Sequence, residues 1–371
     1  MTTEELHESL HHVPSDLEQI PIVWRYELLK HLRSKRLLAS IALVFVVLVP
    51  INFLPPALDV PYSGTTENEA VAFLEPEDMA GIAGAGIPEF GSIALLDKSA
   101  IDLDSLEVFL GGVPFDDEDG AAWFTLRMTY QGASAYALIF TSNVTAADVT
   151  VSYEWFTAPD EFAGIFLGFG AIIVIICATF FGADALVSEF QNRTGYLIFP
   201  NPIKKPMIYI GKFAASMTAS IAVLLLLYGG VAILSMFNAR GIDDDLGLSF
   251  LFAVEYLVAV MAIAYLISAL LKGTTGATVL TFLLFLLILP IIDGVAMFTE
   301  TKVEGSLTFS GDVVSYILLD PYPVDWAYET AGFEFTFYYP DPATSALVIA
   351  AYAFIAVLLG AFLFNRKQLV G

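Results

Sequence analysis

The chain has 371 residues, of which 57% are hydrophobic, and its mean hydropathy is +0.72. A water-soluble protein of this length could not bury so much apolar surface, so the composition excludes the ordinary soluble classes. The net charge is −24, with 40 acids against 16 bases, and an acidic surface repels nucleic acid. Cys177 is the single cysteine; it cannot form a disulfide within the chain and is expected to pack as a small apolar residue.

Six apolar stretches are each long enough for a membrane-spanning helix, which needs roughly 20 residues. They are residues 37–58, 162–186, 213–237, 246–271, 273–297 and 343–364. We expect helices because backbone polar groups in lipid must be satisfied within the segment. The first stretch is expected to be a retained anchor, since Pro55-Pro56 lie near its end in place of a small-residue cleavage site. The predicted fold class is an all-α polytopic membrane protein with six transmembrane helices.

The placement of charges predicts the orientation of these helices. Lys and Arg mark cytoplasmic loops, and six spans put 12 bases on one side and 4 on the other. We therefore predict a multi-pass protein of the cell (plasma) membrane with both termini in the cytoplasm. Residues 59–161, on the predicted outer side, hold 19 acids and two bases. Their scattered placement favours the acidic surface of a protein that works in high salt over a cation-collecting mouth.

The predicted organisation follows the spans. Residues 1–36 are a cytoplasmic tail and an interfacial amphipathic helix, expected to begin at Pro21 because proline suits a first helical position. The other units are helix 1 at 37–58, an extracellular β-rich domain at 59–161, helices 2–5 at 162–298 with a cytoplasmic coupling loop at 187–212, an extracellular segment at 299–342, and helix 6 with the C-terminus at 343–371.

Alternating apolar and polar residues predict strands in the extracellular domain, at 106–110, 126–130, 134–141 and 149–155. Asp116–Gly120 is expected to be a turn. The aromatic residues of 299–342 are expected to pack against this domain and the membrane interface. Asn143, in an Asn-Val-Thr sequence, is a possible glycosylation site.

Several kinds of chemistry are missing from the sequence. All four histidines, His7, His11, His12 and His31, precede the first span, which argues against zinc proteolysis and Ser-His catalysis. The first three have helical spacing, so a metal site is an alternative to a solvated tail. No phosphate-binding loop is present. The intramembrane carboxylates are Asp184, Glu255 and Asp293, each near a span end, where they are either wetted or paired, or functional.

The loop after the second predicted span has the most specific pattern in the chain. Its elements are Asp184, Ser188-Glu189, Arg193-Thr194-Gly195, Pro202-Ile203-Lys204-Lys205 and Gly211-Lys212. This pattern resembles the permease subunits of the ABC type 2 exporter family, in which a Ser-Glu pair, a short helix, a Pro-(Val/Ile)-(Ser/Lys)-(Arg/Lys) turn and a Gly-Lys pair occur in this order. The long domain before it resembles family members with a large extracellular insertion between the first two spans.

The resemblance implies an ABC exporter permease whose short helix docks in a cleft of a separate ABC ATPase subunit. That partner would bind ATP and Mg, so the chain itself is expected to be no enzyme and to hold no cofactor or metal. The residues expected to couple to the ATPase are Ser188, Glu189, Phe190, Arg193, Thr194, Pro202, Lys204 and Lys205. A second permease copy, or a homologous permease, would complete a dimer in the lipid bilayer.

The sequence leaves two other functions open. One is a membrane-anchored receptor or assembly protein whose extracellular domain binds a partner without transport. The other is a secondary carrier, which would need more membrane-embedded coupling groups than this chain offers. A short helix tied to two spans can transmit movement from a soluble motor, and Glu189 and Arg193, spaced i, i+4, are expected to stabilise it.

Overall fold

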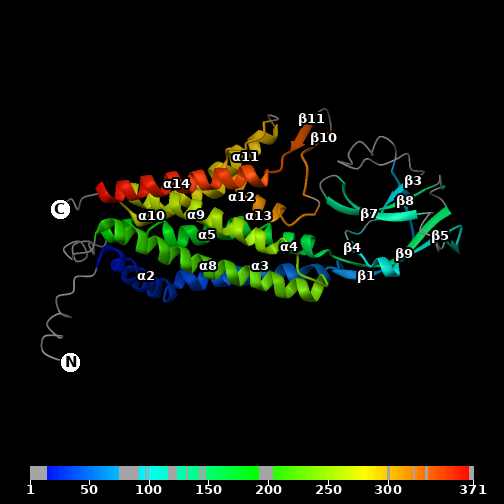
Figure 1. The fold of residues 1–371 in the computed structure, drawn as a ribbon, viewed down its shortest axis with the longest axis horizontal. Helices are drawn as coiled ribbons and strands as arrows, with labels where there is room; N and C mark the ends of the chain where they lie inside the picture. Colours follow the sequence, from blue (N-terminus) through cyan, green and yellow to red (C-terminus); the bar gives the residue numbers. More distant parts are fainter. Residues whose placement is uncertain are drawn as a thin grey trace, which may run out of the picture.

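The computed structural model describes residues 15–74, 92–96, 98, 100–115, 123–130, 133–141, 144, 148–191, 204–298, 301–320, 322–330 and 333–366. These residues form a long helical bundle with a β domain at one end and helix α2 (Asp16–Leu32) at the other (Figure 1). We refer to the two ends as the β end and the α2 end.

The part of the chain that the structure describes contains six helical segments that are long and apolar enough to cross a membrane, as predicted. They are α3 (Lys35–Ala57); the run of α4 (Pro159–Leu167), α5 (Gly170–Gly182) and α6 (Val187–Gln191); α8 (Lys205–Asn238); α9 (Leu246–Leu270); the run of α10 (Thr274–Leu283), the π-helical η4 (Leu284–Ile288) and α11 (Leu289–Phe298); and α14 (Pro342–Arg366).

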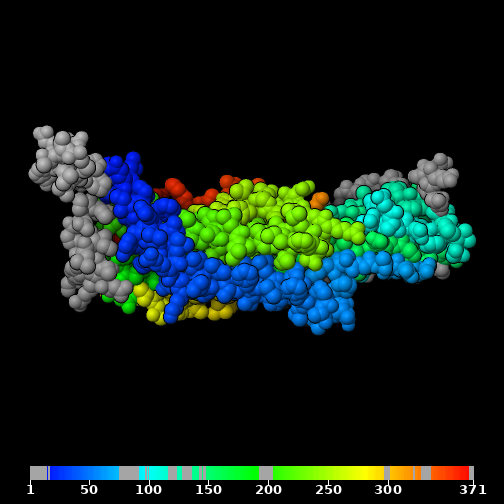
Figure 2. All heavy atoms as spheres, turned by 90° about the horizontal axis from the view of Figure 1, so that it is seen from below, coloured from blue at the N-terminus to red at the C-terminus, as the bar shows by residue number. Residues whose placement is uncertain are grey.

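The centre of the bundle is formed by α5 and α9, with α8 and α14 packed against them. Tyr256, Tyr265 and Cys177 are fully buried there, which confirms the prediction for the cysteine. Figure 2 shows α3 lying along the outside of the bundle beside α8. Large apolar side chains such as Phe45 and Phe354 are exposed on α3 and α14, as expected for helix faces that a bilayer would cover.

Helix α2 begins five residues earlier than the sequence analysis predicted. Its N-cap is Ser15, whose side chain forms a capping box with Glu18, and Pro21 therefore lies inside the helix. The overlooked signal is the Ser-x-x-Glu pattern, which satisfies two backbone N–H groups at a helix start and outweighs the preference of proline for the first position. Helix α2 packs along α8.

The β domain contains two sheets. One has the order β1-β9-β5-β6, with β4 also paired to β9, and the other has the order β2-β3-β8-β7. The strands are β1 (Ser63–Ala70), β2 (Ala72–Phe73), β3 (Ser92–Leu95), β4 (Ala100–Ile101), β5 (Glu107–Leu110), β6 (Val113–Pro114), β7 (Trp123–Tyr130), β8 (Ala133–Phe140) and β9 (Val149–Phe156). The four strands expected from alternation are confirmed as β5, β7, β8 and β9. The sequence analysis missed β1, which is polar and pairs with β9.

The domain is attached to the first two spans by short connections. The first residue of β1, Ser63, pairs with Phe156 at the end of β9, and α3 and α4 end and begin only a few residues away. The Thr157 N–H donates to the Tyr62 carbonyl at 2.7 Å, and the Tyr62 hydroxyl donates to the Ile51 carbonyl on α3 at 2.5 Å. The β1–β9 pair is therefore a direct continuation of two transmembrane helices.

The segment before α14 folds onto the helical bundle. Its elements are α12 (Leu307–Gly311), α13 (Val313–Tyr316) and a hairpin of β10 (Trp326–Thr330) and β11 (Phe333–Phe337). Helix α12 packs on α14, α13 packs on α9, and β11 packs on α11. The sequence analysis expected aromatic packing here but predicted neither the short helices nor the hairpin.

Candidate functional site

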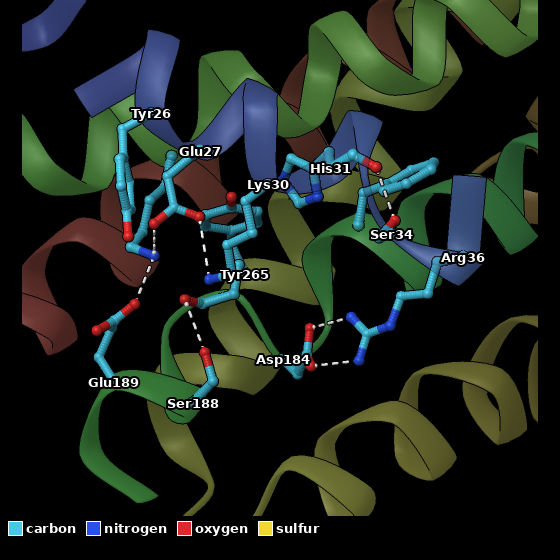
Figure 3. A pocket seen from close by; sticks show the side chains of 13 residues that line it. Tyr26, Glu27, Lys30, His31, Ser34, Arg36, Asp184, Ser188, Glu189 and Tyr265 are labelled. Carbon is cyan, nitrogen blue, oxygen red and sulfur yellow. Dashed lines mark hydrogen bonds and ion pairs between the residues drawn. The ribbon is translucent and has the colours of Figure 1, made fainter. Parts of the chain in front are cut away.

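A cleft of about 440 Å³ opens at the α2 end, between α2, the end of the second span, α8 and α9 (Figure 3). Its lining residues are Tyr26, Glu27, Lys30, His31, Ser34, Arg36, Phe181, Asp184, Ala185, Ser188, Glu189, Lys212 and Tyr265. Three of the residues that the sequence analysis selected, Asp184, Ser188 and Glu189, lie here together. Phe181 and Ala185 are their neighbours in sequence, and the other lining residues come from α2, the start of α3, α8 and α9.

A buried ion-pair triad joins three helices in this cleft. Lys212 Nζ of α8 lies 2.6 Å from Glu27 Oε1 of α2 and 2.7 Å from Glu189 Oε1 of α6. Lys212 is 2% exposed, and each carboxylate is 6% exposed. Buried charges are costly unless they are paired with good geometry, so these contacts hold the three helices at fixed positions.

Two bases determine the charge state of Glu27. Burial would raise the pKa of this carboxyl, but the positive charges of Lys212 and Lys30 outweigh burial and lower it. Lys30 Nζ lies 3.2 Å from the second carboxylate oxygen of Glu27. Glu27 is therefore ionised at neutral pH, and it carries the charge that the triad needs.

The preceding residue explains why α2 can approach so closely. A Cβ atom at Gly211 would lie 2.7 Å from Cβ of Val23 on α2, closer than real side chains allow. Glycine at this position admits α2, and the next residue, Lys212, binds it. The Gly-Lys pair that the sequence analysis used as a family motif thus has a structural reason.

A second ion pair closes the other side of the cleft. The Arg36 guanidinium at the start of α3 donates to both oxygens of Asp184, at 2.7 and 2.6 Å, and to the Phe180 carbonyl at 2.9 Å. A two-pronged contact of this kind is the strongest that an arginine makes with a carboxylate. Asp184 is therefore a paired carboxylate, one of the two interpretations that the sequence left open.

Further hydrogen bonds attach the short helix α6 to the bundle. The Ser268 hydroxyl of α9 accepts the backbone N–H groups of Leu186 and Val187, at 3.1 and 3.0 Å. The Gln191 side chain accepts the N–H of Thr274 at 2.8 Å, at the first residue of α10. With the triad, α6 is bonded directly to three helices, α8, α9 and α10, and through Lys212 to α2.

His31 of α2 lies at the back of the same cleft. Its ring packs edge-on against Phe181, with ring centroids 5.3 Å apart, and Nε2 lies 3.3 Å from the Ser216 hydroxyl. Burial lowers the pKa of His31 to about 4, so the ring is neutral at pH 7. The sequence analysis counted this histidine but had no signal that it would be enclosed.

The remaining predicted residues lie elsewhere. Phe190 packs edge-on against Phe364 of α14, with centroids 6.0 Å apart, and Lys204 and Lys205 are at the start of α8. Asp293 lies at the β end, where it accepts a hydrogen bond from Thr308, and Glu255 is partly exposed on α9. Arg193, Thr194, Pro202, Asn143, Asp116–Gly120, His7, His11 and His12 fall outside the described residues.

The sequence analysis missed Glu27, Arg36 and Ser268. Glu27 and Lys212 are separated by 185 residues, and nothing in one sequence pairs them. A partial signal was available, because a lysine placed in the first turns of an apolar helix needs a buried partner.

A comparison with known families identifies the class of protein. A family model described as an ABC-2 family transporter protein matches residues 21–369. The chain belongs to this family and is an ABC-2 type membrane transport component, which confirms the resemblance found in the loop. A search of the curated proteins gives no match.

Proposed function

We propose that this chain is the transmembrane permease subunit of an ATP-driven exporter, and that a separate ABC ATPase subunit binds ATP and Mg and hydrolyses the ATP. The observation that carries the proposal is the family match over residues 21–369. In this proposal the α2 end faces the cytoplasm of a plasma membrane and the β domain faces outward. A second permease copy or a homologous permease completes the path.

The bonding of α6 supports this proposal. A motor subunit that pushed on α6 would act on α8, α9 and α10 through direct bonds and on α2 through Lys212. Packed elements joined by hydrogen bonds and ion pairs move as rigid bodies. The arrangement is therefore suited to convert a movement at one end of the bundle into a rearrangement of several spans.

The geometry gives Glu189 a different role from the one that the sequence suggested. Its carboxylate lies 2.7 Å from Lys212 Nζ, and Figure 3 shows Glu189 directed into the cleft. In this proposal Glu189 therefore positions α6 and does not itself contact the partner. We propose the exposed residues Gln191 and Lys204 as part of the docking surface. Arg193, Thr194 and Pro202 stay predictions of the sequence.

The test is purification of the tagged chain from its native host in a mild detergent. We expect an ATP-hydrolysing chain to co-purify, and Lys204→Glu to reduce its amount because the charge at the docking surface is reversed. The matched control is Lys98→Glu in the β domain, which makes the same charge change at the opposite end and should leave co-purification unchanged.

Two results would contradict the proposal. The first is that no ATPase activity co-purifies with the unmodified chain at any detergent concentration that keeps the chain folded; the chain would then have no motor partner. The second is that Lys204→Glu and Lys98→Glu lower the amount of co-purified ATPase equally; the docking surface would then not be at the α2 end.

A further inference from the structure

A second cavity, of about 200 Å³, lies at the β end between α11 and the segment that precedes α14. Aromatic rings form most of its wall: Phe309 of α12, Tyr316 of α13, Phe337 of β11, and Tyr339. Tyr316 and Tyr339 meet edge-on with centroids 5.0 Å apart. The rings are thus held in fixed orientations by contacts with one another.

Trp326 of β10 supports this wall from behind. It stacks on Phe337 with centroids 4.7 Å apart, and its indole N–H lies 3.4 Å from the Tyr339 hydroxyl. The β10–β11 hairpin, which the sequence analysis did not predict, therefore holds this aromatic wall in position.

Two carboxylates face the same cavity. Asp293 comes from α11 and Asp312 from the junction of α12 and α13, and they are close enough to interact electrostatically. One oxygen of Asp293 accepts a hydrogen bond from Thr308 at 2.5 Å. Within the described residues its other oxygen is buried without a hydrogen-bond partner.

No base compensates these acids in the cavity wall, among the residues that the structure describes. Lys302 is the single base of residues 299–342, and it forms an ion pair with Asp325 at 2.9 Å. Burial and, after it, the neighbouring Asp293 raise the pKa of Asp312 to about 7, as expected for an acid that has another acid and no cation beside it. A cation in the cavity would stabilise the ionised form of both acids. The site therefore favours a positively charged occupant.

Tyr256 of α9 lies behind this part of the wall. Its side chain is 0% exposed, and its hydroxyl has no hydrogen-bond partner within the described part of the chain. A Cβ atom at Gly311, the residue before Asp312, would lie 2.7 Å from the Tyr256 ring, so the ring packs against the junction that carries Asp312. Tyr256 is not among the residues that line the cavity, so it positions that junction and is not a contact for an occupant.

The chemistry of the wall distinguishes between kinds of cation. Calcium prefers six to eight oxygen ligands, whereas this cavity offers two carboxylates among aromatic rings. Ring faces attract ammonium groups, above all desolvated quaternary ammonium. We propose that this cavity binds a small organic cation of the ammonium or quaternary ammonium class, with Asp293 and Asp312 as counter-ions and Tyr316, Phe337 and Tyr339 as the aromatic wall.

The test is calorimetric titration of the full chain in detergent at constant ionic strength. Choline chloride is the probe, and 3,3-dimethylbutan-1-ol, its uncharged carbon analogue of the same shape, is the matched ligand. We expect choline to bind and the alcohol to bind at least about tenfold more weakly. No ATP or ATPase is used, so the result is independent of the proposed transport function.

Variants assign the binding to this cavity. Asp293→Asn, Asp312→Asn and Tyr339→Leu should each weaken choline binding by about tenfold or more. Glu304→Gln is the control, because Glu304 is an exposed acid of the same segment and lies outside the cavity lining; it should leave binding unchanged. If an Asp variant does not fold, the comparison of choline with the alcohol on the unmodified chain still tests the proposal.

Three results would overturn the proposal. Equal binding of choline and the alcohol would show an apolar cavity without charge selection. Binding of calcium chloride that displaces choline and depends on Asp293 would show a metal site. Absence of choline binding to the folded, unmodified chain would show that the cavity takes no organic cation of this size.

Discussion

The ion pairs of Arg240 at the β end and of Lys212 at the α2 end differ strongly in burial. The β end carries many acids, and two of its ion pairs are long and exposed: Arg240 lies 3.4 Å from Asp102 and 3.3 Å from Glu154, with the arginine side chain about half exposed. A third pair there, Arg127 with Asp160 at 2.6 Å, is short and largely buried. The α2 end has fewer charges, but Lys212 is almost completely enclosed by its two carboxylates. Salt screens the first kind of pair and hardly affects the second, so the number of charges in a region does not indicate where electrostatics fixes the structure.

The largest effect should come from Lys212→Met. This change leaves Glu27 and Glu189 buried without their cation, and removing one partner of a buried pair costs about 3–5 kcal/mol. Thermal unfolding in detergent measures it. At the β end, Lys302→Met removes a single, half-exposed pair with Asp325 and should cost less than about 1 kcal/mol.

A triple variant checks the cause of that effect. Glu27→Gln and Glu189→Gln, added to Lys212→Met, remove all the charges of the triad and should recover most of the lost stability, because a neutral replacement of a buried ion pair is often tolerated. If the triple variant were no more stable than Lys212→Met, the packing of the lysine chain and not its charge would hold the helices.

The next largest effect is expected for Gly211→Ala. Its new Cβ would meet Val23 of α2 at 2.7 Å, so α2 must move away from α8, at a cost of about 2 kcal/mol. Gly229→Ala is the matched control on the same helix, because nothing lies within 4 Å of a Cβ there. Unfolding temperatures of the two variants give the comparison, and equal values would mean that α2 is loosely held.

A smaller effect, of about 1–2 kcal/mol, should appear as a pH dependence from His31. Its pKa falls from 6.5 to about 4 in the folded protein because it is buried, so its stabilising contribution is complete above pH 6.5. As the pH falls from about 6.5 to about 4, the unfolded chain binds a proton that the folded chain does not, and stability decreases.

The groups that face His31 are Glu27, Lys30, Lys212 and Asp184. The pKa of Glu27 is lowered from 4.5, so Glu27 stays ionised between pH 7 and pH 5. The pKa values of Asp243 and Asp312 are raised to about 6 and about 7, so these acids titrate in the same interval, and the difference between the unmodified chain and His31→Gln isolates the histidine. The measurement is the unfolding temperature of the unmodified chain and of His31→Gln at both pH values. The unfolding temperature of the unmodified chain should fall more between pH 7 and pH 5 than that of His31→Gln. An equal fall would show that His31 binds a proton as readily in the folded chain as in the unfolded chain.

The smallest effect is expected for Arg240→Gln at the β end. Both of its ion pairs are long and exposed, so the change should cost at most about 0.5 kcal/mol. The difference should vanish when the salt concentration is raised, which unfolding temperatures at low and high salt would show. A large effect that persists in high salt would mean that the contact of Arg240 with the Phe156 ring holds the domain in place.

The sequence predicted what depends on length and periodicity. Six apolar runs gave six helices, and alternation gave β5, β7, β8 and β9, because both patterns follow directly from burial. It missed β1, whose residues are polar and whose paired residues in β9 lie at least 80 positions away. It also missed the pairing of Lys212 with Glu27, since long-range electrostatic partners leave no local pattern. The start of α2 was wrong for a different reason: a local signal, the capping box, was present and was not weighed.

The way in which the β domain is joined to the bundle has a mechanical consequence. A domain on long linkers would move independently of the helices to which it is attached. Here the strand pair that begins at Ser63 and ends at Phe156 continues two spans directly. Any change in the separation or relative height of these spans must shear one strand against the other or carry the whole domain along. The domain is thus a lever on the first two spans, and an antibody or a crosslink that immobilised it would act on them as well.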